Sequence, residues 1–258
     1  MKTIAIVTGA SSGIGKEFFL SLKNKAPLDE IWVVARGEEK LKALQAECET
    51  PVRVFALDLS KTESSATLEN ALAAEEIEIR YLICASGFGR FCAVEEDDSA
   101  TLQNMVDLNC RSIVGVTKAC MPYMQKGGAM LLVASVAAFQ PIPYIATYAA
   151  SKAFVLSYGR ALNKELRKSK GAKVLCVCPF WTKTAFFDRA VSNENKVVKK
   201  YAVMYEPSQI VKRAWKDEAK KRKDVSICGA YSKGQALLVK LLPHKAVMSI
   251  WMSQQGLN

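Results

Sequence analysis

"TGASSGIG", residues 8–15, directly follows the apolar run "TIAIV" and opens the first stretch of the chain with helical periodicity. Its glycines, Gly9, Gly13 and Gly15, permit a tight turn and a close approach of another group to the backbone. The N-terminus of the helix that follows offers free N–H groups to a pyrophosphate. A P-loop is excluded, because Lys16 follows the last glycine without the Gly-Lys-Ser/Thr arrangement. The stretch therefore predicts a dinucleotide site between the first strand and the first helix.

Apolar, β-rich runs alternate with helical stretches along the rest of the chain. The expected strands are residues 3–7, 31–35, 52–57, 80–85, 129–135 and 173–178. The expected helices are residues 13–25, 38–48, 62–76, 100–126 and 146–169. Strands that are hydrophobic on both faces and alternate with helices indicate a parallel sheet covered on both sides. The predicted fold class is α/β: a doubly wound, Rossmann-type parallel sheet with helices on both faces.

The length and composition suit a single domain over residues 1–258. Half of the 258 residues are hydrophobic and 24% are charged, which is enough for one large core. We expect a mobile substrate loop over residues 180–206, where no period is visible, and a helical extension over residues 231–258. There is no run of eighteen apolar residues, and the N-terminus turns glycine-rich too soon for a signal peptide, so a cytoplasmic protein is expected.

The reactive residue types exclude several classes of protein. Eight cysteines contain no C-x-x-C pair and lie partly in apolar runs, which favours free buried thiols over a disulfide framework. His244 is the only histidine, which argues against metal sites built on two histidines and against a Ser-His-Asp hydrolase. No metal is expected. The net charge is +11, and the densest run, "KDEAKKRKD" (216–224), has no interleaved aromatic residues. It favours a solvated helix end over a nucleic-acid site.

The end of the second predicted strand indicates which nicotinamide dinucleotide is bound. An acidic residue there bonds the ribose hydroxyls of NAD, whereas an arginine accommodates the 2′-phosphate of NADP. Here Ala35 stands at the place of the acid and Arg36 follows it. Arg36 favours NADP(H) over NAD(H), although Glu38 and Glu39 follow closely and leave NAD(H) open.

Three more polar residues are candidate contacts of the cofactor. Ser11 and Ser12 offer hydroxyl donors to the same phosphate. Asp58 follows the third predicted strand and can bond the adenine amino group; an acid near the N-cap of a helix is the alternative interpretation.

Tyr148 and Lys152 lie four positions apart in the helix expected over residues 146–169, on one face. A phenol titrates near ~10 in water. A neighbouring ammonium, together with an oxidised nicotinamide, should lower the pKa of Tyr148 and make it a proton donor and acceptor for an alcohol and ketone pair. Ser135 ends the fifth predicted strand and can face the same crevice. Asn109 is an amide in the middle of an expected helix, where it can hold the helix and a water chain open.

The set "TGASSGIG", Asn109, Ser135, Tyr148 and Lys152 resembles the short-chain dehydrogenase/reductase family, from residue 3 to about residue 230. The resemblance implies that Ser135 orients the substrate oxygen and that Tyr148 transfers the proton. It implies that Lys152 holds the nicotinamide ribose and lowers the pKa of Tyr148, while Asn109 binds a water that links Lys152 to solvent.

The resemblance also extends the list of expected cofactor contacts, with two departures from the family's pattern. The stretch "CASG" (84–87) replaces an Asn-Asn-Ala-Gly motif, and "PF" (179–180) replaces Pro-Gly, so the local loop geometry can differ. Thr184 matches the threonine beside the nicotinamide amide. The cofactor contacts implied in addition to those above are Ile14, Leu59, Ser86, Gly87, Pro179, Thr182 and Thr184.

An aromatic set predicts a bulky apolar ketone or alcohol as the substrate. Its members are Phe88, Phe91, Phe139, Tyr144, Trp181, Phe186 and Phe187. The expected substrate contacts are Ser135, Phe139, Tyr144, Tyr148, Phe180 and Trp181. The stretch "YAASKAFVLSYGRALNKELRKSKGAKVLCVCPFW" is similar to hydroxysteroid dehydrogenases and long-chain ketoacyl reductases.

The leading hypothesis is therefore an NADP(H)-dependent oxidoreductase acting on a hydroxysteroid or bile acid. A ketoacyl reductase or a general carbonyl reductase is the alternative. A cofactor-binding sensor without catalysis is the hypothesis from another class, and the complete set of four residues argues against it. A homo-oligomer, either a dimer or a tetramer, is expected, with no nucleic-acid partner. For residues 234–255, where Pro243 interrupts a long amphipathic helix, a dimer contact or a lid is favoured over contact with a membrane.

Overall fold

Seven parallel strands form one sheet in the computed structural model, which describes residues 1–25, 27–191 and 197–257. The strand order is β3-β2-β1-β4-β5-β6-β7, so the chain reverses its direction of travel across the sheet between β1 and β4. The strands are β1 (Lys2–Thr8), β2 (Glu30–Ala35), β3 (Val52–Ala56), β4 (Ile77–Cys84), β5 (Met124–Val133), β6 (Lys173–Cys178) and β7 (Val225–Ile227).

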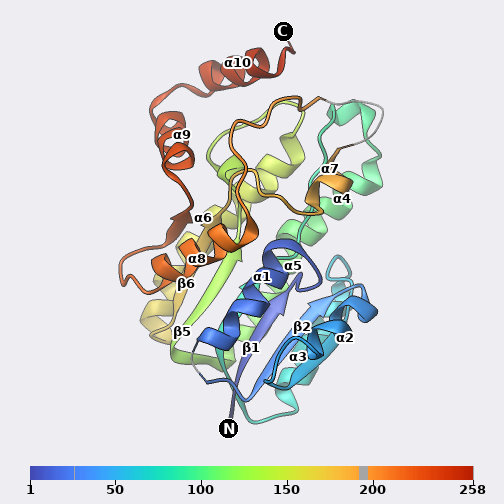
Figure 1. Cartoon of the computed structure of the whole chain (residues 1–258), viewed down its shortest axis with the longest axis vertical. Coiled ribbons are helices and arrows are strands. Elements are labelled where there is room, and N and C mark those ends of the chain that lie inside the picture. The colour runs from blue at the N-terminus through green and yellow to red at the C-terminus, as the bar shows by residue number, and fades with distance from the viewer. Residues whose placement is uncertain (26, 192–196, 258) are drawn as a thin grey trace.

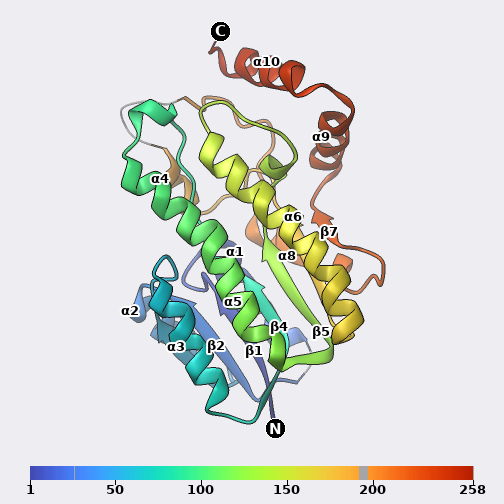
Figure 2. The same cartoon turned by 180° about the vertical axis from the view of Figure 1, so that it is seen from behind.

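Helices cover both faces of this sheet (Figures 1 and 2). They are α1 (Gly13–Ser21), α2 (Glu38–Gln45), α3 (Thr62–Ala73), α4 (Ser99–Val106), α5 (Ser112–Cys120), α6 (Ala146–Ser169), α7 (Phe186–Ala190), α8 (Pro207–Glu218), α9 (Ala230–Leu241) and α10 (His244–Gln255). Short 3-10 turns are η1 (Leu22–Asn24), η2 (Val94–Glu96), η4 (Met121–Tyr123) and η5 (Val136–Phe139), and η3 (Asp107–Arg111) is a π turn.

The strands divide the core into two layers because successive side chains point to opposite faces. Ile4 and Ile6 of β1 pack into a core with α3, α5 and α6, which Figure 2 shows in front of the sheet. Ala5 and Val7 pack into a second core with α1, α2 and α8. All six residues of β6 are buried, as a central strand covered on both faces requires. The prediction of a doubly wound α/β sheet is confirmed.

Two elements differ from the prediction. β7, only three residues long, was not expected, and it extends the sheet beyond β6. The helix expected over residues 100–126 is divided instead into α4, the π turn η3 and α5, and it ends in the turn η4.

The predicted loop and extension contain regular structure. Residues 180–206 include α7, and hydrogen bonds between Trp181, Lys183 and Tyr205 join the two ends of this segment. Residues 192–196 of the predicted loop lie outside the described residues. The extension expected over residues 231–258 contains most of α9 and all of α10.

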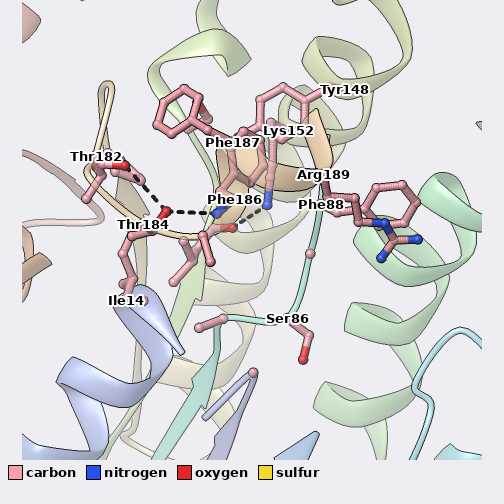
Figure 3. A pocket seen from close by; sticks show the side chains of 18 of the residues that line it. Ile14, Ser86, Phe88, Tyr148, Lys152, Thr182, Thr184, Phe186, Phe187 and Arg189 are labelled. Atoms are coloured by element: carbon pink, nitrogen blue, oxygen red, sulfur yellow. Dashed lines mark hydrogen bonds between the residues drawn. The ribbon is translucent and has the colours of Figure 1, made fainter. Parts of the chain in front are cut away.

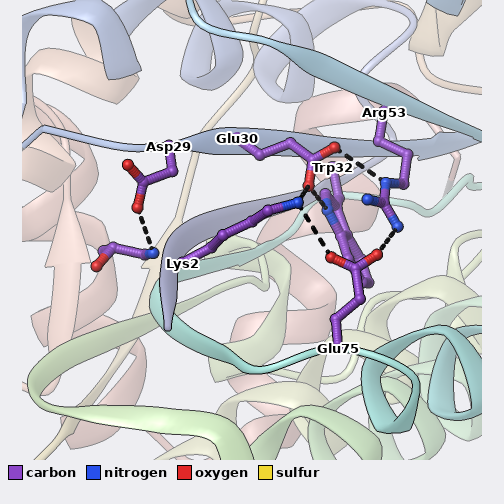
Figure 4. A network of polar contacts seen from close by, with 7 residues as sticks. Lys2, Asp29, Glu30, Trp32, Arg53 and Glu75 are labelled. Atoms are coloured by element: carbon purple, nitrogen blue, oxygen red, sulfur yellow. Dashed lines mark hydrogen bonds and ion pairs between the residues drawn. The ribbon is translucent and has the colours of Figure 1, made fainter.

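A cluster of charged side chains joins the N-terminal ends of β1, β2 and β3, at the edge opposite the glycine turn (Figure 4). The ammonium of Lys2 lies 3.3 Å from a carboxylate oxygen of Glu75, and the Arg53 guanidinium pairs with both Glu75 and Glu30. The indole of Trp32 donates to Glu30 at 2.9 Å. These contacts stabilise the N-terminal ends of the three strands. The site lies at the opposite edge of the sheet, at the carboxyl ends of the strands.

None of the described helices combines the length and the hydropathy needed to cross a bilayer.

The turn after β1 requires glycine at its first position. Gly9 has φ +68°, and a Cβ there would lie 2.7 Å from the backbone carbonyl carbon of Ala85. We expect Gly9→Ala to lower the free energy of unfolding by about 2 kcal/mol or more, through backbone strain and a clash that the rigid strand end cannot relieve. Urea unfolding of the cofactor-free protein measures it. Gly234→Ala is the control, because a Cβ there meets nothing within 4 Å inside a helix, and it should stabilise by up to ~1 kcal/mol. Equal changes in the free energy of unfolding for the two substitutions would contradict the requirement for glycine at position 9.

Candidate active site

A cavity of about 1000 Å³ opens at the carboxyl ends of the strands, beside the point where the strand order reverses. Ligands of open α/β sheets bind at this point, because the loops that leave neighbouring strands diverge there. The cavity extends from the glycine turn, past the ends of β4, β5 and β6, to α7 and α10. Figure 3 shows Tyr148 and Lys152 on one side of it and Ser86 and Ile14 below them.

Most of the residues predicted for the site line this cavity. They are Gly9, Ser11, Ser12, Gly13, Ile14, Gly15, Arg36, Asp58, Leu59, Ser86, Gly87, Ser135, Tyr148, Lys152, Pro179, Phe180, Trp181, Thr182 and Thr184. Asn109 is fully buried behind the wall, in the π turn η3.

The structure does not place two predicted substrate contacts in the wall. Phe139 ends η5, where its ring packs beside the core and lies 5.2 Å from the ammonium of Lys240. Tyr144 occupies a left-handed turn with φ 64°, the only non-glycine residue with positive φ among those described. The prediction used position in the chain, which does not reveal that the turn before α6 directs these rings elsewhere.

The side chain of Asn109 holds two segments of the site together. Its Nδ2 donates to the carbonyl of Phe88 and to Oγ of Ser151, both at 2.9 Å, and its Oδ1 accepts from the N–H of Phe88 at 3.1 Å. The loop after β4 is thereby tied to α6. Gly87 is the point of closest approach, since a Cβ there would lie 2.9 Å from Oδ1 of Asn109 and 3.2 Å from Nζ of Lys152. Only glycine leaves both groups in place.

Lys152 is 5% exposed, and its ammonium donates to the carbonyl of Val133, at the end of β5, at 2.9 Å. Burial lowers its pKa to about 8, because the charged form loses hydration that a single carbonyl does not replace. Its Nζ lies 5.7 Å from the centre of the Tyr148 ring. The predicted pairing of phenol and amine on one helix face is therefore present.

In the chain alone the pKa of Tyr148 is raised, whereas the lowered pKa expected from the sequence was for a site that also holds an oxidised nicotinamide. Burial raises it to about 12, and a hydrogen bond with the Ser135 side chain only partly opposes this. Phe186 packs against the phenol ring, with 5.4 Å between ring centres, and contributes to the apolar surroundings. In the chain alone, dehydration of the phenolate outweighs the hydrogen bond from Ser135. Tyr148 is therefore a protonated phenol at neutral pH.

Ser135 lies two residues beyond β5 as the N-cap of η5, where its Oγ accepts from the N–H of Ala137 at 3.1 Å. Its hydroxyl also forms a hydrogen bond with the Tyr148 phenol, which brings the two groups together at the cavity. The tetrad thus combines two donors at the cavity, Ser135 and Tyr148, with Lys152 behind them and Asn109 as their support.

The other end of the cavity fits a dinucleotide. The first turn of α1 receives no hydrogen bond from a capping side chain, so its N–H groups are available for an anion. Thr184 closes over the turn, since a Cβ on Gly13 would lie 3.0 Å from its methyl group. Burial raises the pKa of Asp58, but hydrogen bonds from Ser60 and the positive charge of Arg36 outweigh it, so the pKa is lowered. Asp58 bonds its own turn, as the alternative interpretation holds, and it also faces the cavity.

Arg189 is a cavity residue that the sequence did not predict. Its guanidinium lies 3.4 Å from the ring centre of Phe88, and Figure 3 shows it pointing away from Tyr148 and Lys152. Burial lowers its pKa, followed by repulsion from Arg36. Among the described residues, neither arginine forms an ion pair. Arg189 belongs to the segment that lacks periodicity, so no sequence pattern identified it.

Aromatic rings form the wall beyond the tetrad. Phe91 lies 5.9 Å from Trp181 and 6.0 Å from Phe186, measured between ring centres. Trp251 of α10 lines the same space and donates from its indole to the carbonyl of Pro143 at 3.1 Å. The sequence did not connect Trp251 with the site, because more than a hundred residues separate it from Pro143. Polar groups thus line the part of the cavity near the glycine turn, and aromatic rings line the part beyond Tyr148.

α10 is held over this wall by Gln255, which is 3% exposed. Its side-chain oxygen accepts from the backbone N–H groups of Lys199 and Lys200 at 2.9 and 3.0 Å. α10 thus lies beside the aromatic wall, and the expectation of a dimer contact or a lid for residues 234–255 stays a prediction.

Comparison with known proteins identifies the family. Residues 3–195 match the family model for short chain dehydrogenases. The chain belongs to the short-chain dehydrogenase family. A very-long-chain 3-oxoacyl-CoA reductase of Neurospora crassa is 33% identical over 221 residues, which are 82% of this chain and 63% of that protein. Very-long-chain 3-oxoacyl-CoA reductase-B of Danio rerio is 29% identical over 70% of this chain and 60% of its own length.

The chain spans about three fifths of the length of these curated relatives. Among solved structures, a short-chain dehydrogenase from Sphingobium yanoikuyae in complex with NADPH has a TM-score of 0.77 and 26% identity, with 96% of each chain covered.

The burial of Lys152 predicts how stability depends on pH. A lysine in the unfolded chain titrates near ~10.4, so between about pH 8 and that value the unfolded chain binds more protons than the folded chain. The contribution of this group therefore rises with pH across that window. We expect the unfolding free energy of the wild type, relative to Lys152→Met, to increase by about 2 kcal/mol between pH ~7 and ~9.5 in urea titrations. Lys164→Met, on the exposed face of α6, is the control and should show no such change. If the difference in unfolding free energy between the wild type and Lys152→Met did not change with pH, the lowered pKa of Lys152 would be contradicted.

Proposed function

We propose that this chain is an NADP(H)-dependent oxidoreductase that reduces the ketone of a long-chain 3-oxoacyl thioester to the secondary alcohol. The observation that carries the proposal is the position of Tyr148, between a polar crevice that fits a dinucleotide and a wall of aromatic rings. The similarity to 3-oxoacyl-CoA reductases supports an acyl substrate over the hydroxysteroid or bile acid that the sequence put first.

The tetrad supplies the proton and orients the ketone. A nicotinamide dinucleotide held in the polar part of the cavity would supply the hydride for the substrate carbon. Tyr148 donates its phenolic proton to the carbonyl oxygen, and Ser135 donates a hydrogen bond to the same oxygen. Lys152, charged at neutral pH because its pKa is about 8, stabilises the phenolate that remains. Asn109 keeps the loop at Gly87 and Phe88 in place against α6.

The protonation states of the free site favour reduction. With its pKa near 12, Tyr148 holds the proton that a general acid must deliver. Oxidation requires the phenolate instead, whose formation depends on an additional positive charge at the site. At neutral pH the cofactor-free chain therefore carries Tyr148 in the protonated form that ketone reduction requires.

Two arginines support NADP(H) as the cofactor. Arg36 follows β2 at the place where an acid would bond a ribose, and Arg189 faces the same part of the cavity from α7. Among the described residues neither guanidinium forms an ion pair, although the Asp58 carboxylate interacts with both, so both remain available for a phosphate dianion. The related dehydrogenase from Sphingobium yanoikuyae was solved with NADPH, which agrees with this assignment.

A substrate panel tests the reaction. With NADPH, we expect kcat/KM to rise as the acyl chain of a 3-oxoacyl thioester lengthens, because each added methylene is buried against the aromatic wall. Tyr148→Phe should lower kcat by ~10²-fold to ~10⁴-fold while its affinity for NADPH, measured by fluorescence titration, stays within about twofold. Persistent turnover by Tyr148→Phe would remove this residue from its proposed role. Faster reduction of oxosteroids than of every acyl thioester would favour the hydroxysteroid alternative.

The dissociation constants of NADPH and NADH test the cofactor. Arg36→Ala should weaken NADPH binding by ~10-fold to ~100-fold, as the loss of a charged hydrogen bond to phosphate implies, and leave NADH within about twofold. Lys42→Ala is the matched control: it removes a cation from α2 that is 2.8 Å from Glu38 and does not line the cavity. Equal NADPH affinity in wild type and Arg36→Ala would overturn the assignment.

A further inference from the structure

The helix α9 is apolar on two opposite faces. Its inner face packs on η5 and carries Ser232, Ala236 and Val239, all of which are buried. Its outer face, a quarter to a third of the helix circumference, carries Leu241 and Leu237, which are 74% and 61% exposed. Leu238 and Tyr231, about half exposed, and the glycine at 234 complete the outer face. We call this surface the outer leucine face of α9.

Such a surface is costly for a helix that water surrounds. A helix with one buried stripe ordinarily presents polar residues on the opposite side. Here three leucines of α9 are more than half exposed, which is typical of a surface that contacts another apolar medium. Figures 1 and 2 show α9 at the margin of the molecule, outside α6, with no described element beyond it.

The charge around the outer leucine face has one sign. The sequence from Val225 to Leu257 contains no aspartate or glutamate. Lys233 and Lys240 lie at the flank of the face, and Lys245 is in the first turn of α10; all three are exposed. This pattern of leucines bordered by lysines matches the headgroups and acyl boundary of an anionic lipid bilayer. Two copies packed through this face would instead bring their lysines toward each other.

The outer leucine face also lies close to the cavity. Tyr231 and Gln235 of α9 line the cavity, and Trp251 of α10 forms part of its aromatic wall. A surface bound to lipid through α9 therefore places the apolar part of the cavity next to the bilayer. A substrate that partitions into membranes could then enter without crossing bulk water.

We propose that the outer leucine face of α9 docks on the surface of an anionic bilayer, with the lysines at the headgroups and the leucines at the acyl boundary. The helix lies in the interface and does not cross the membrane, in agreement with its length. The proposal does not depend on the cofactor or the reaction, because its test measures binding alone.

Vesicle co-sedimentation of the full chain tests the proposal. The probes are vesicles of phosphatidylcholine alone and vesicles that also contain phosphatidylglycerol at about 30%. We expect the partition coefficient of the wild type to be at least ~10-fold higher on the anionic vesicles, and to fall with added salt. Leu237→Gln/Leu241→Gln should lower it at least ~10-fold. Lys233→Gln/Lys245→Gln should remove the preference for anionic lipid.

The matched control is Val94→Gln, which removes an apolar side chain that is 55% exposed in η2, far from α9 in the chain. It should bind vesicles as the wild type does. Circular dichroism and thermal melting must show that each variant is folded; because the replaced leucines are exposed, folding should be retained. Absence of vesicle binding by the wild type, or equal binding to both kinds of vesicle, would overturn the proposal. So would loss of a dimer or tetramer by the leucine variant in sedimentation velocity, since α9 would then contact a second copy.

Discussion

The amide of Asn109 is the contact on which the arrangement of the site depends. Its three hydrogen bonds link the backbone of Phe88 to Ser151, and so join the loop after β4 to the helix that carries Tyr148 and Lys152. An ordinary helical turn would direct residue 109 differently; the π turn η3 admits one extra residue and aims the amide inward. Each of its polar atoms is paired, so this buried group stabilises one geometry instead of destabilising the core.

The sequence predicted the sheet because burial on two faces and alternation with helices leave few topologies. It predicted the tetrad because four short motifs occur in order.

The sequence missed features that depend on distance in space. β7 has too few residues for a periodic signal, and Arg189 lies where no period exists. Trp251 reaches the site only because Gln255 fixes α10 against Lys199 and Lys200. Phe139 and Tyr144 show the converse error, since proximity in the chain to Tyr148 does not decide where a ring points.

The electrostatics of the tetrad also could not be obtained from residue types. Positive charge from Lys152 and an oxidised nicotinamide suggested a lowered pKa for Tyr148. In the chain alone the phenol is buried, and the loss of hydration of the phenolate outweighs the hydrogen bond from Ser135. The same desolvation lowers the pKa of Lys152. Both shifts favour the less charged form of each group, which is what a dry site imposes before a charged cofactor enters. A cofactor that carries positive charge on its ring would then shift both equilibria, and this couples cofactor redox state to proton position.

The polar part and the aromatic part of the cavity suit different ligands. The part near the glycine turn offers helix N–H groups and two arginines, which suit a polyanion that arrives from water. The other part is enclosed by rings from α7, Trp181 and α10, and offers little to a hydrated ligand. A substrate that fits this part is poorly soluble, so its concentration is highest in lipid. A position beside a bilayer would therefore raise the concentration of such a substrate at the cavity. The outer leucine face of α9 lies on the side of the molecule where that advantage would be realised.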